Sequence, residues 1–294
     1  MIEPLLSDDA LMDDMNSASK GPDALHLWWL GQSGYMVEYN DTRVLIDPYL
    51  SDSLTKKYEA TEKPHVRISR RVVDPAWLAR ISVITSSHGH TDHLDAETLA
   101  AIRATDEELR TQWYPMLVAP RAIEPLAKER WGGEVDVLLN DGESAVWGSM
   151  AVHGVLASHP EIERDESGNS KYLGYVFDFG DFRVYHAGDT IVFDGLAGKV
   201  KEKGPIDIAI LPINGQLGNM DGLAAAKLAR EIGAKVVIPC HYDLFEFNTA
   251  DPQAVFVPEC ERLGQAHRVL KLGERLTITT AEGWGTPRQE EEAI

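Results

Sequence analysis

Cysteines and long apolar runs are the first things that this sequence lacks. Its two cysteines, Cys240 and Cys260, are too few for a disulfide framework and suit a reducing compartment, where a free cysteine is usually a small buried thiol. No run approaches the ~18 apolar residues of a membrane-spanning helix, and residues 1–23 lack the basic and apolar segments of a signal peptide. We therefore expect a cytoplasmic protein that has no membrane segment.

Positive charge is also scarce. The 28 Lys and Arg residues stand against 47 Asp and Glu residues, which gives a formal net charge of −19. A field of this sign repels polyanions, so we expect neither nucleic acid nor an anionic membrane as a partner. The composition has no strong bias, because 44% of the residues are hydrophobic and 26% are charged. These values are typical of globular proteins and argue against disorder, collagen and coiled coil.

The predicted strands and helices follow a repeated order: an antiparallel meander, a βαβ segment, a second meander and a second βαβ segment. We expect strands at 25–30, 34–39, 43–50, 81–87, 115–119, 135–139, 144–148, 150–159, 172–180 and 181–189, strands over DIAILPI and AKVVIPCH, and helices from Asp74-Pro75, from Asp95, across 121–130, across 221–232 and from Asp251-Pro252 to about Leu263. A hairpin around Gly273 is expected to close the chain. Such a duplication favours an α/β fold, a four-layer αβ/βα sandwich.

One central domain accounts for most of the chain. Residues 25–284 contain no Gly/Ser-rich linker that would divide them, so we expect a single domain with a core of two halves. Residues 1–24 are predicted to be a loosely held acidic arm, and residues 285–294 an acidic, solvated tail. Trp and Phe residues near the ends of the chain are compatible with a homo-oligomer.

The segment SHGHTDH at residues 87–93 is the most informative part of the sequence. It places four potential metal ligands, His88, His90, Asp92 and His93, directly after an apolar strand. A hydrophilic capping loop would not need three histidines, and the whole chain has only 10. Imidazole and carboxylate at this spacing predict a metal site, and one loop of this kind can serve two neighbouring ions.

Three further candidate ligands stand at the ends of predicted strands. They are His159 before Pro160, Asp189 after Gly188, and His241 after the apolar run AKVVIPC. Active sites of layered folds gather at strand ends, so the four segments are expected to converge. The count assigns His88, His90 and His159 to one ion and Asp92, His93 and His241 to the other, with Asp189 as the bridge.

Two divalent ions held in this way would leave positions open for water. The pKa of such a water falls to near ~7, so that it is partly hydroxide at neutral pH. A hydroxide held between the two ions is the expected nucleophile.

The motif HGHTDH, with the later His159, Asp189 of GDT and His241, resembles the metallo-β-lactamase superfamily. Within it, LWWLGQSGYMVEY, RVLIDPY, VYHAGDT and AKVVIPCHYDLFEFNTADPQ are similar to the L-ascorbate-6-phosphate lactonase-like metal-dependent hydrolases. The resemblance implies a sandwich of the metallo-β-lactamase type and the same seven metal ligands. It also implies a lactonase-like hydrolase, in which Asp92 orients the nucleophile as well as binding metal.

The expected ions are zinc or manganese. The oxygen-reducing diiron branch of the superfamily carries a carboxylate at the second motif position, where this chain has His90. That difference favours hydrolysis over redox chemistry at iron. Imidazole-rich, thiol-free ligands suit zinc, the carboxylates leave manganese open, and the lactonase resemblance leans toward manganese.

Several residues around the predicted site have two interpretations. Asp47 and His186 are candidates for orienting the ligand imidazoles, although Asp47 could equally serve the Asp-Pro turn. His153 is expected to be a strand histidine rather than a ligand. The basic stretches Arg67–Arg71 and Arg164–Lys171 could dock a phosphate but are more simply interpreted as solvated loops.

The substrate is predicted to be a small molecule. The leading hypothesis is attack of the hydroxide on a lactone or ester carbonyl, with one ion polarising the carbonyl and the other stabilising the leaving alkoxide. A phosphodiesterase acting on a small-molecule or lipid phosphodiester is the first alternative, because the same two ions suit attack at phosphorus. A non-catalytic metal-binding protein is the second. The segment NGQLGNMDG at 214–222 differs from what a strict ascorbate-phosphate lactonase should have, which leaves the substrate open.

Overall fold

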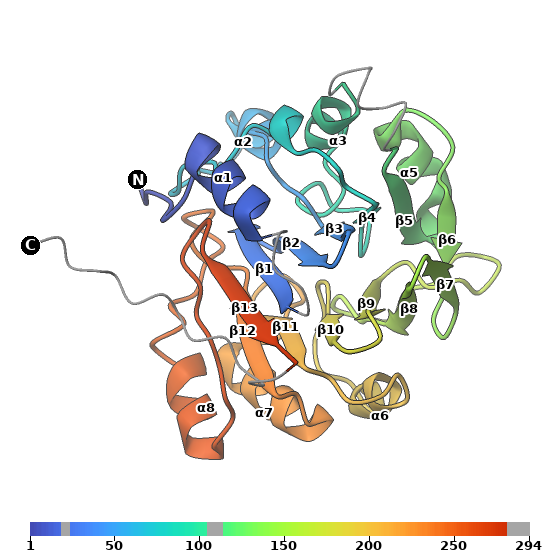
Figure 1. Ribbon diagram of the computed structural model, residues 1–294, viewed down its shortest axis with the longest axis vertical. Helices are drawn as coiled ribbons and strands as arrows, with labels where there is room; N and C mark the ends of the chain where they lie inside the picture. The colour runs from blue at the N-terminus through green and yellow to red at the C-terminus, as the bar shows by residue number, and fades with distance from the viewer. Residues whose placement is uncertain (19–23, 105–113, 281–294) are drawn as a thin grey trace, which may run out of the picture.

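The computed structural model describes residues 1–18, 24–104 and 114–280. In this part, two mixed sheets lie face to face and helices cover their outer sides (Figure 1). The arrangement confirms the α/β fold predicted from the order of elements. The expected tail at 285–294 lies outside the described residues.

The first sheet has seven strands in the order β13-β1-β2-β3-β4-β5-β6. Strands β13, β1, β2 and β3 pair antiparallel, whereas β3 to β6 pair parallel. Its strands are β1 Ala24–Gly31, β2 Gly34–Tyr39, β3 Thr42–Ile46, β4 Val83–Thr85, β5 Met116–Pro120, β6 Val137–Leu139 and β13 Arg275–Thr279.

The second sheet repeats this plan with six strands in the order β12-β11-β10-β9-β8-β7. Here β7 to β10 form the antiparallel meander, and β10, β11 and β12 pair parallel. Its strands are β7 Ser144–Trp147, β8 Met150–Leu156, β9 Leu173–Asp178, β10 Arg183–His186, β11 Ile208–Pro212 and β12 Val236–Cys240.

Helices lie outside the two sheets. Near the first sheet are α1 Asp8–Ala18, α2 Ser53–Tyr58, η1 Pro75–Trp77, α3 Ala96–Arg103, η2 Arg121–Ile123 and α5 Glu124–Trp131; near the second are α6 Leu196–Lys201, α7 Gly222–Ile232 and α8 Phe256–Leu263 (Figure 1). Asp74, Asp95 and Asp221 cap η1, α3 and α7, because each side chain accepts a backbone N–H of the first turn. None of the described helices is long and apolar enough to cross a membrane.

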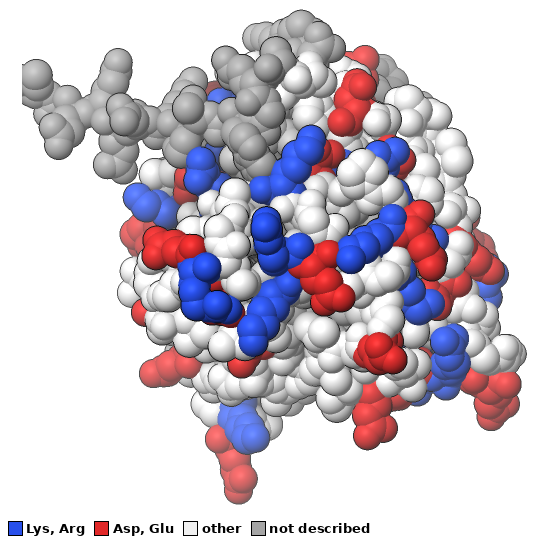
Figure 2. Space-filling model, turned by 90° about the horizontal axis from the view of Figure 1, so that it is seen from below, with Lys and Arg blue, Asp and Glu red and all other residues white. Residues whose placement is uncertain are grey.

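One hydrophobic core fills the space between the sheets. Fully buried aromatic residues from both sheets, including Trp28, Trp29 and Tyr35 of the first and Tyr175 and Phe177 of the second, belong to the same cluster. The face drawn in Figure 2 carries acidic and basic side chains interspersed with one another. The shared core rigidly joins the two halves of the fold.

The N-terminal segment differs from the loose acidic arm that the sequence suggested. Residues 8–18 form α1, and Leu11, Met15 and Ala18, spaced four and three residues apart, are buried on one face. Asp14 accepts a hydrogen bond of 2.9 Å from the indole N–H of Trp28. The sequence analysis considered only the acidic composition of the segment and so did not predict this apolar face, which packs against the core.

Four other elements also differ from expectation. The final hairpin around Gly273 does not form, because residues 267–272 make only an isolated bridge of His267 with Val237, while β13 pairs with β1 instead. Helix α8 begins at Phe256, several residues after Asp251-Pro252. Helices α2 and α6 were not predicted; each has only six residues, too short to show a clear apolar period.

Candidate metal centre

The HGHTDH segment forms a tightly held loop after β4. All three residues of β4 are buried, and the backbone N–H of His93 and Leu94 both donate to the carbonyl of His90. Arg130 of α5 donates to the carbonyl oxygens of Gly89 and Leu94 at 2.8 and 3.0 Å. The loop is therefore fixed from inside by its own turn and from outside by α5.

The structure brings all seven predicted ligand residues together. His88, His90, His159 and Asp189 form one group of side chains whose candidate ligand atoms lie within 4.8 Å of one another, and Asp92, His93 and His241 form a second. His159 follows β8, Asp189 follows β10 and His241 follows β12. Convergence of strand ends, which the sequence predicted, is thus observed.

Asp189 belongs to the first group and also contacts the second. Its Oδ1 is 2.6 Å from Nε2 of His241 and 3.2 Å from Nε2 of His93, both of the second group. Its Oδ2 is 3.6 Å from Nε2 of His159, which belongs to the first group. The two oxygens of one carboxylate therefore face different groups, as a bridging ligand requires.

Buried polar atoms without hydrogen bonds mark the centre as a place for cations. Within the described part of the chain, His93 Nε2, His241 Nε2 and Asp189 Oδ1 are buried and have no hydrogen-bond partner of acceptable geometry. Such atoms are costly to bury unless another group satisfies them. The donor set consists of imidazole nitrogen and carboxylate oxygen, which suits zinc and manganese. The residues present thus fit a pair of divalent metal ions.

Electrostatics at the centre links Asp189 to its imidazole neighbours. Burial by itself raises the pKa of Asp189, but His241 and His93 outweigh it and hold that pKa well below its usual value. Burial lowers the pKa of His93, whereas Asp189 and Asp92 raise it more, to well above its usual value. The site thus stabilises an ionised carboxylate, the form that binds metal.

Asp47 supports the centre through contacts with His93 and Ser87. It is fully buried, its Oδ2 lies 2.7 Å from Nδ1 of His93, and its Oδ1 accepts the backbone N–H of Ser87 at 2.9 Å. The hydroxyl of Ser87 also donates to Asp47. His186 differs, because its two ring nitrogens contact the Ser33 carbonyl and the Gly188 N–H. It braces the turn before Asp189 and contacts no proposed ligand imidazole by hydrogen bonding.

Gln32 is a site residue that the sequence analysis missed. Its side chain is fully buried, and Nε2 lies 2.9 Å from Asp92 Oδ2 and 3.1 Å from His241 Nδ1. Its carbonyl accepts the backbone N–H of His241 at 3.3 Å. The residue sits in the turn between β1 and β2, with a positive φ of 51°. Sequence pattern showed only a GQSG turn, since both partners lie far along the chain.

The loop at 214–220 holds His159. The Gly218 carbonyl lies 2.9 Å from Nδ1 of His159, which leaves Nε2 facing Asp189. Gly218 has a φ of +91°, and a Cβ there would lie 2.8 Å from Pro160 N and 3.0 Å from His159 Nδ1. Only glycine allows the loop to approach the imidazole this closely.

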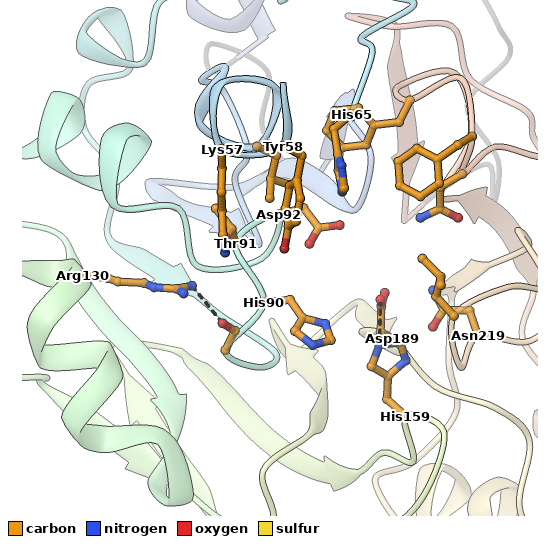
Figure 3. Close-up of a pocket in the computed structure, with 16 residues that line it drawn as sticks. Lys57, Tyr58, His65, His90, Thr91, Asp92, Arg130, His159, Asp189 and Asn219 are labelled. Atoms are coloured by element: carbon orange, nitrogen blue, oxygen red, sulfur yellow. Dashed lines mark hydrogen bonds and ion pairs between the residues drawn. The ribbon is translucent and has the colours of Figure 1, made fainter. Parts of the chain in front are cut away.

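A cavity of about 420 Å³ opens over the centre. Figure 3 shows His90, Asp92, His159 and Asp189 around it, with Tyr58 and His65 on the side opposite His159. The residues that line it are Leu54, Lys57, Tyr58, His65, Gly89, His90, Thr91, Asp92, Arg130, His159, Asp189, Leu217, Asn219, Phe245, Phe247 and Asn248. A volume of this size suits a small organic molecule.

Other sequence candidates lie away from the cavity. Arg67 pairs with Asp52 at 2.9 Å, and Lys171 pairs with Glu163 at 2.9 Å, so the two basic stretches are surface loops that do not line the cavity. His153 bonds to Ser144 on β7 at 2.6 Å and belongs to neither group of candidate ligands. The basic residues that do line the cavity are Lys57 and Arg130.

Comparison with known proteins agrees with the geometry. A family model described as "Beta-lactamase superfamily domain" matches residues 26–241. A UPF0173 metal-dependent hydrolase of Rubrobacter xylanophilus is 31% identical over 79% of this chain and 88% of its own length. One of Pyrococcus horikoshii is 29% identical over 85% of this chain and 98% of its own length.

Solved structures share the fold at lower identity. The metallo hydrolase Igni18 of Ignicoccus hospitalis superposes with a TM-score of 0.62 and 22% identity, over 87% of this chain and 98% of its own. An isothiocyanate hydrolase from Delia radicum gut bacteria gives a TM-score of 0.66 at 16% identity, over 87% and 99% of the two chains. These likenesses confirm the four-layer sandwich of the metallo-β-lactamase type.

Proposed function

The chain belongs to the β-lactamase superfamily and to its metal-dependent hydrolases, and we propose that it uses two divalent ions to hydrolyse a lactone or ester. The observation that carries the proposal is the position of Asp189, whose two oxygens face two different groups of candidate ligands. A single carboxylate in that position is suited to hold two ions next to each other.

We propose the same division of ligands between the two ions that the sequence analysis predicted. His88, His90 and His159 would hold one ion, Asp92, His93 and His241 the other, and Asp189 both. When bound, such ions make a water acidic enough to act as hydroxide near neutral pH and polarise a carbonyl oxygen. Zinc and manganese both suit this ligand set.

The side chains of this protein have separate tasks in the proposed reaction. Asp92 borders the cavity and accepts a hydrogen bond from Gln32, which supports its proposed role of orienting the attacking water. Asp47 and the Gly218 carbonyl hold the Nδ1 atoms of His93 and His159 and leave their Nε2 atoms free. Hydrolysis adds water across the acyl C–O bond, which gives a carboxylic acid and an alcohol from an ester, or one hydroxy acid from a lactone.

The test combines metal content with turnover. The purified protein should hold close to two ions per chain by plasma mass spectrometry, and should hydrolyse a small lactone but not bis-p-nitrophenyl phosphate. Asp189→Ala should lose turnover and metal together, because it removes the carboxylate that faces both groups. Asp194→Ala is the matched control, since Asp194 is exposed and lies outside both groups.

Three results would overturn the proposal. Cleavage of the phosphodiester without lactone hydrolysis would indicate a phosphodiesterase. Two ions without any turnover would indicate a metal-binding protein that is not a catalyst. Full activity of the Asp189→Ala variant would remove the dinuclear assignment.

A further inference from the structure

The cavity over the centre has one polar side and one aromatic side. Its floor is formed by His90, Asp92, His159 and Asp189, which we call the metal floor. The other side carries four aromatic rings, which we call the ring wall: Tyr58, His65, Phe245 and Phe247. A substrate bound over the floor must therefore also meet the wall.

Contacts among its own members hold the ring wall in place. His65 stacks on Tyr58 with ring centroids 4.2 Å apart, and it meets Phe245 and Phe247 edge-on at 5.2 and 4.5 Å. The wall comes from two distant segments, near α2 and after β12, whose backbones pair through Arg67 and Phe245. The faces of these preformed rings favour a flat apolar group in the substrate.

Asn219 is a polar residue that lines the cavity and belongs to neither group of candidate ligands. Its side chain is only 7% exposed, and its carbonyl oxygen Oδ1 has no hydrogen-bond partner in the described part of the protein. Asn219 lines the cavity, and in Figure 3 it is drawn on the same side as Asp189 and His159. A buried amide oxygen without a hydrogen-bond partner is unusual and suggests that a bound molecule completes the site.

The backbone around Asn219 is held by hydrogen bonds, so the unpartnered Oδ1 does not result from a loose loop. The Asn219 N–H donates to the Gln216 carbonyl at 3.0 Å, and the Met220 N–H donates to the Thr190 carbonyl at 2.9 Å. The second bond ties the loop to the residue after Asp189. The side chain is thus presented to the cavity from a fixed backbone.

We propose that the cavity binds an ester or lactone with an apolar, preferably aromatic, body, and that Asn219 hydrogen-bonds its carbonyl end beside the metal floor. This inference rests on the proposed hydrolase function and names the substrate class for the same site. Rotation of the Asn219 carboxamide by half a turn exchanges its Oδ1 and Nδ2 atoms, which puts an N–H donor where the unpartnered oxygen lies. The aromatic body would then lie against the ring wall, across the cavity from His159.

A pair of six-membered lactams tests binding without turnover. 5-Phenyl-2-piperidinone and gluconolactam share the cyclic carbonyl and differ in the group that the ring wall would meet. Calorimetric titration of metal-free and metal-loaded protein should give at least ten-fold tighter binding of the phenyl lactam. Phe247→Ala should remove most of that difference and leave the affinity for gluconolactam within two-fold.

Two variants of Asn219 test the carbonyl contact. Asn219→Ala and Asn219→Asp should each weaken binding of the phenyl lactam at least five-fold, because neither side chain can donate a hydrogen bond to the lactam carbonyl. Asn219→Asp keeps the size of the side chain and so controls for packing. Gln216→Ala, on the same loop but exposed, should change nothing, since its backbone carbonyl still accepts the Asn219 N–H.

The outcomes separate this inference from the proposed function. Binding that favours gluconolactam, or that is indifferent to both Asn219 variants, would overturn the inference. Hydrolysis of glucono-δ-lactone in preference to 5-phenyl-δ-valerolactone would overturn it as well. Lactam binding in the expected order, with hydrolysis of neither lactone by the metal-loaded protein, would overturn the hydrolase proposal and support the assignment of the cavity.

Discussion

The carboxylate of Asp47 lies 2.7 Å from Nδ1 of His93, a residue 46 positions further along the chain. Both side chains are fully buried. Asp47 follows β3 directly, with a positive φ of 40°, and His93 closes the loop that follows β4. Because β3 and β4 are neighbouring parallel strands, the contact is set by the sheet itself.

Replacing Asp47 should weaken metal binding although the side chain touches no proposed metal position. Asp47→Asn removes the negative charge that orients the His93 imidazole, and changes of this kind typically reduce metal affinity about 10- to 100-fold. Competition with a chromogenic chelator measures the change. Asp52→Asn, at an exposed carboxylate paired with Arg67, is the control. Equal metal affinity of the Asp47→Asn and Asp52→Asn variants would show that Asp47 does not support metal binding through His93.

Gln32 should matter for the Asp92 side of the centre. Gln32→Leu removes the donor that lies 2.9 Å from Asp92 Oδ2, and Gln32→Glu puts a second carboxylate there. We expect a loss of metal affinity of about ten-fold or more for Leu, and a larger loss for Glu because like charges repel. Ser33→Ala tests the same turn through a hydroxyl that contacts Cys240 instead. If isothermal titration shows that the Gln32→Glu variant binds metal as tightly as the parent, Gln32 does not orient Asp92.

A methyl group at Gly218 should disturb the His159 side of the centre. Gly218→Ala places Cβ at 2.8 Å from Pro160 N, so His159 must shift and the metal content should fall from two ions toward one. Gly180→Ala is a close control, since Gly180 has nearly the same φ of +90° with open space around the added carbon. It should cost roughly 1 kcal/mol of stability from backbone strain and leave the metal content unchanged. Loss of metal in both variants would point to general damage.

His26 should make the free energy of unfolding depend on pH. Burial, followed by the nearby Arg275, lowers the pKa of His26 from 6.5 to about 4. Between these values the unfolded chain takes up a proton that the folded chain does not, so stability is complete above pH 6.5 and falls as the pH is lowered toward 4. At about 1.4 kcal/mol per pKa unit, the loss approaches ~3 kcal/mol.

The measurement is urea unfolding of the parent and of His26→Gln between pH 7.5 and 4.5. The variant lacks the titrating group, so the stability of the parent should decline more steeply than that of the variant. Parallel curves would show that His26 is protonated equally in the folded and unfolded chains.

The convergence of the seven candidate ligands was predictable from the sequence to a large extent because these residues follow strands. Each of His159, Asp189 and His241 ends a short apolar run, and parallel and antiparallel strands of a layered fold deliver such ends to one edge. The HGHTDH loop supplied the remaining ligands within six residues. The sequence pattern was sufficient here, because each candidate ligand stands at a strand end or in one short loop, and both features can be identified locally in the sequence.

The supporting residues could not be predicted in the same way. Gln32 reaches partners 60 and 209 positions away, and the ring wall joins residues near α2 with residues after β12. Only tertiary structure determines such contacts. Likewise α1 is acidic in composition, and its apolar face of Leu11 and Met15 is visible only with the helical period in mind.

The first residues of the chain reach the cavity through two layers of backbone hydrogen bonds. The Ile2 N–H donates to the carbonyl of Ile68, and the Ile68 N–H donates to the carbonyl of Leu244, next to Phe245 of the ring wall. A chain trimmed to the family match at 26–241 would retain every residue that lines the cavity except Phe245, Phe247 and Asn248. It would also lose the outer layer that supports them. The segment that supplies and supports the cavity lining is therefore longer than the segment that matches the family model.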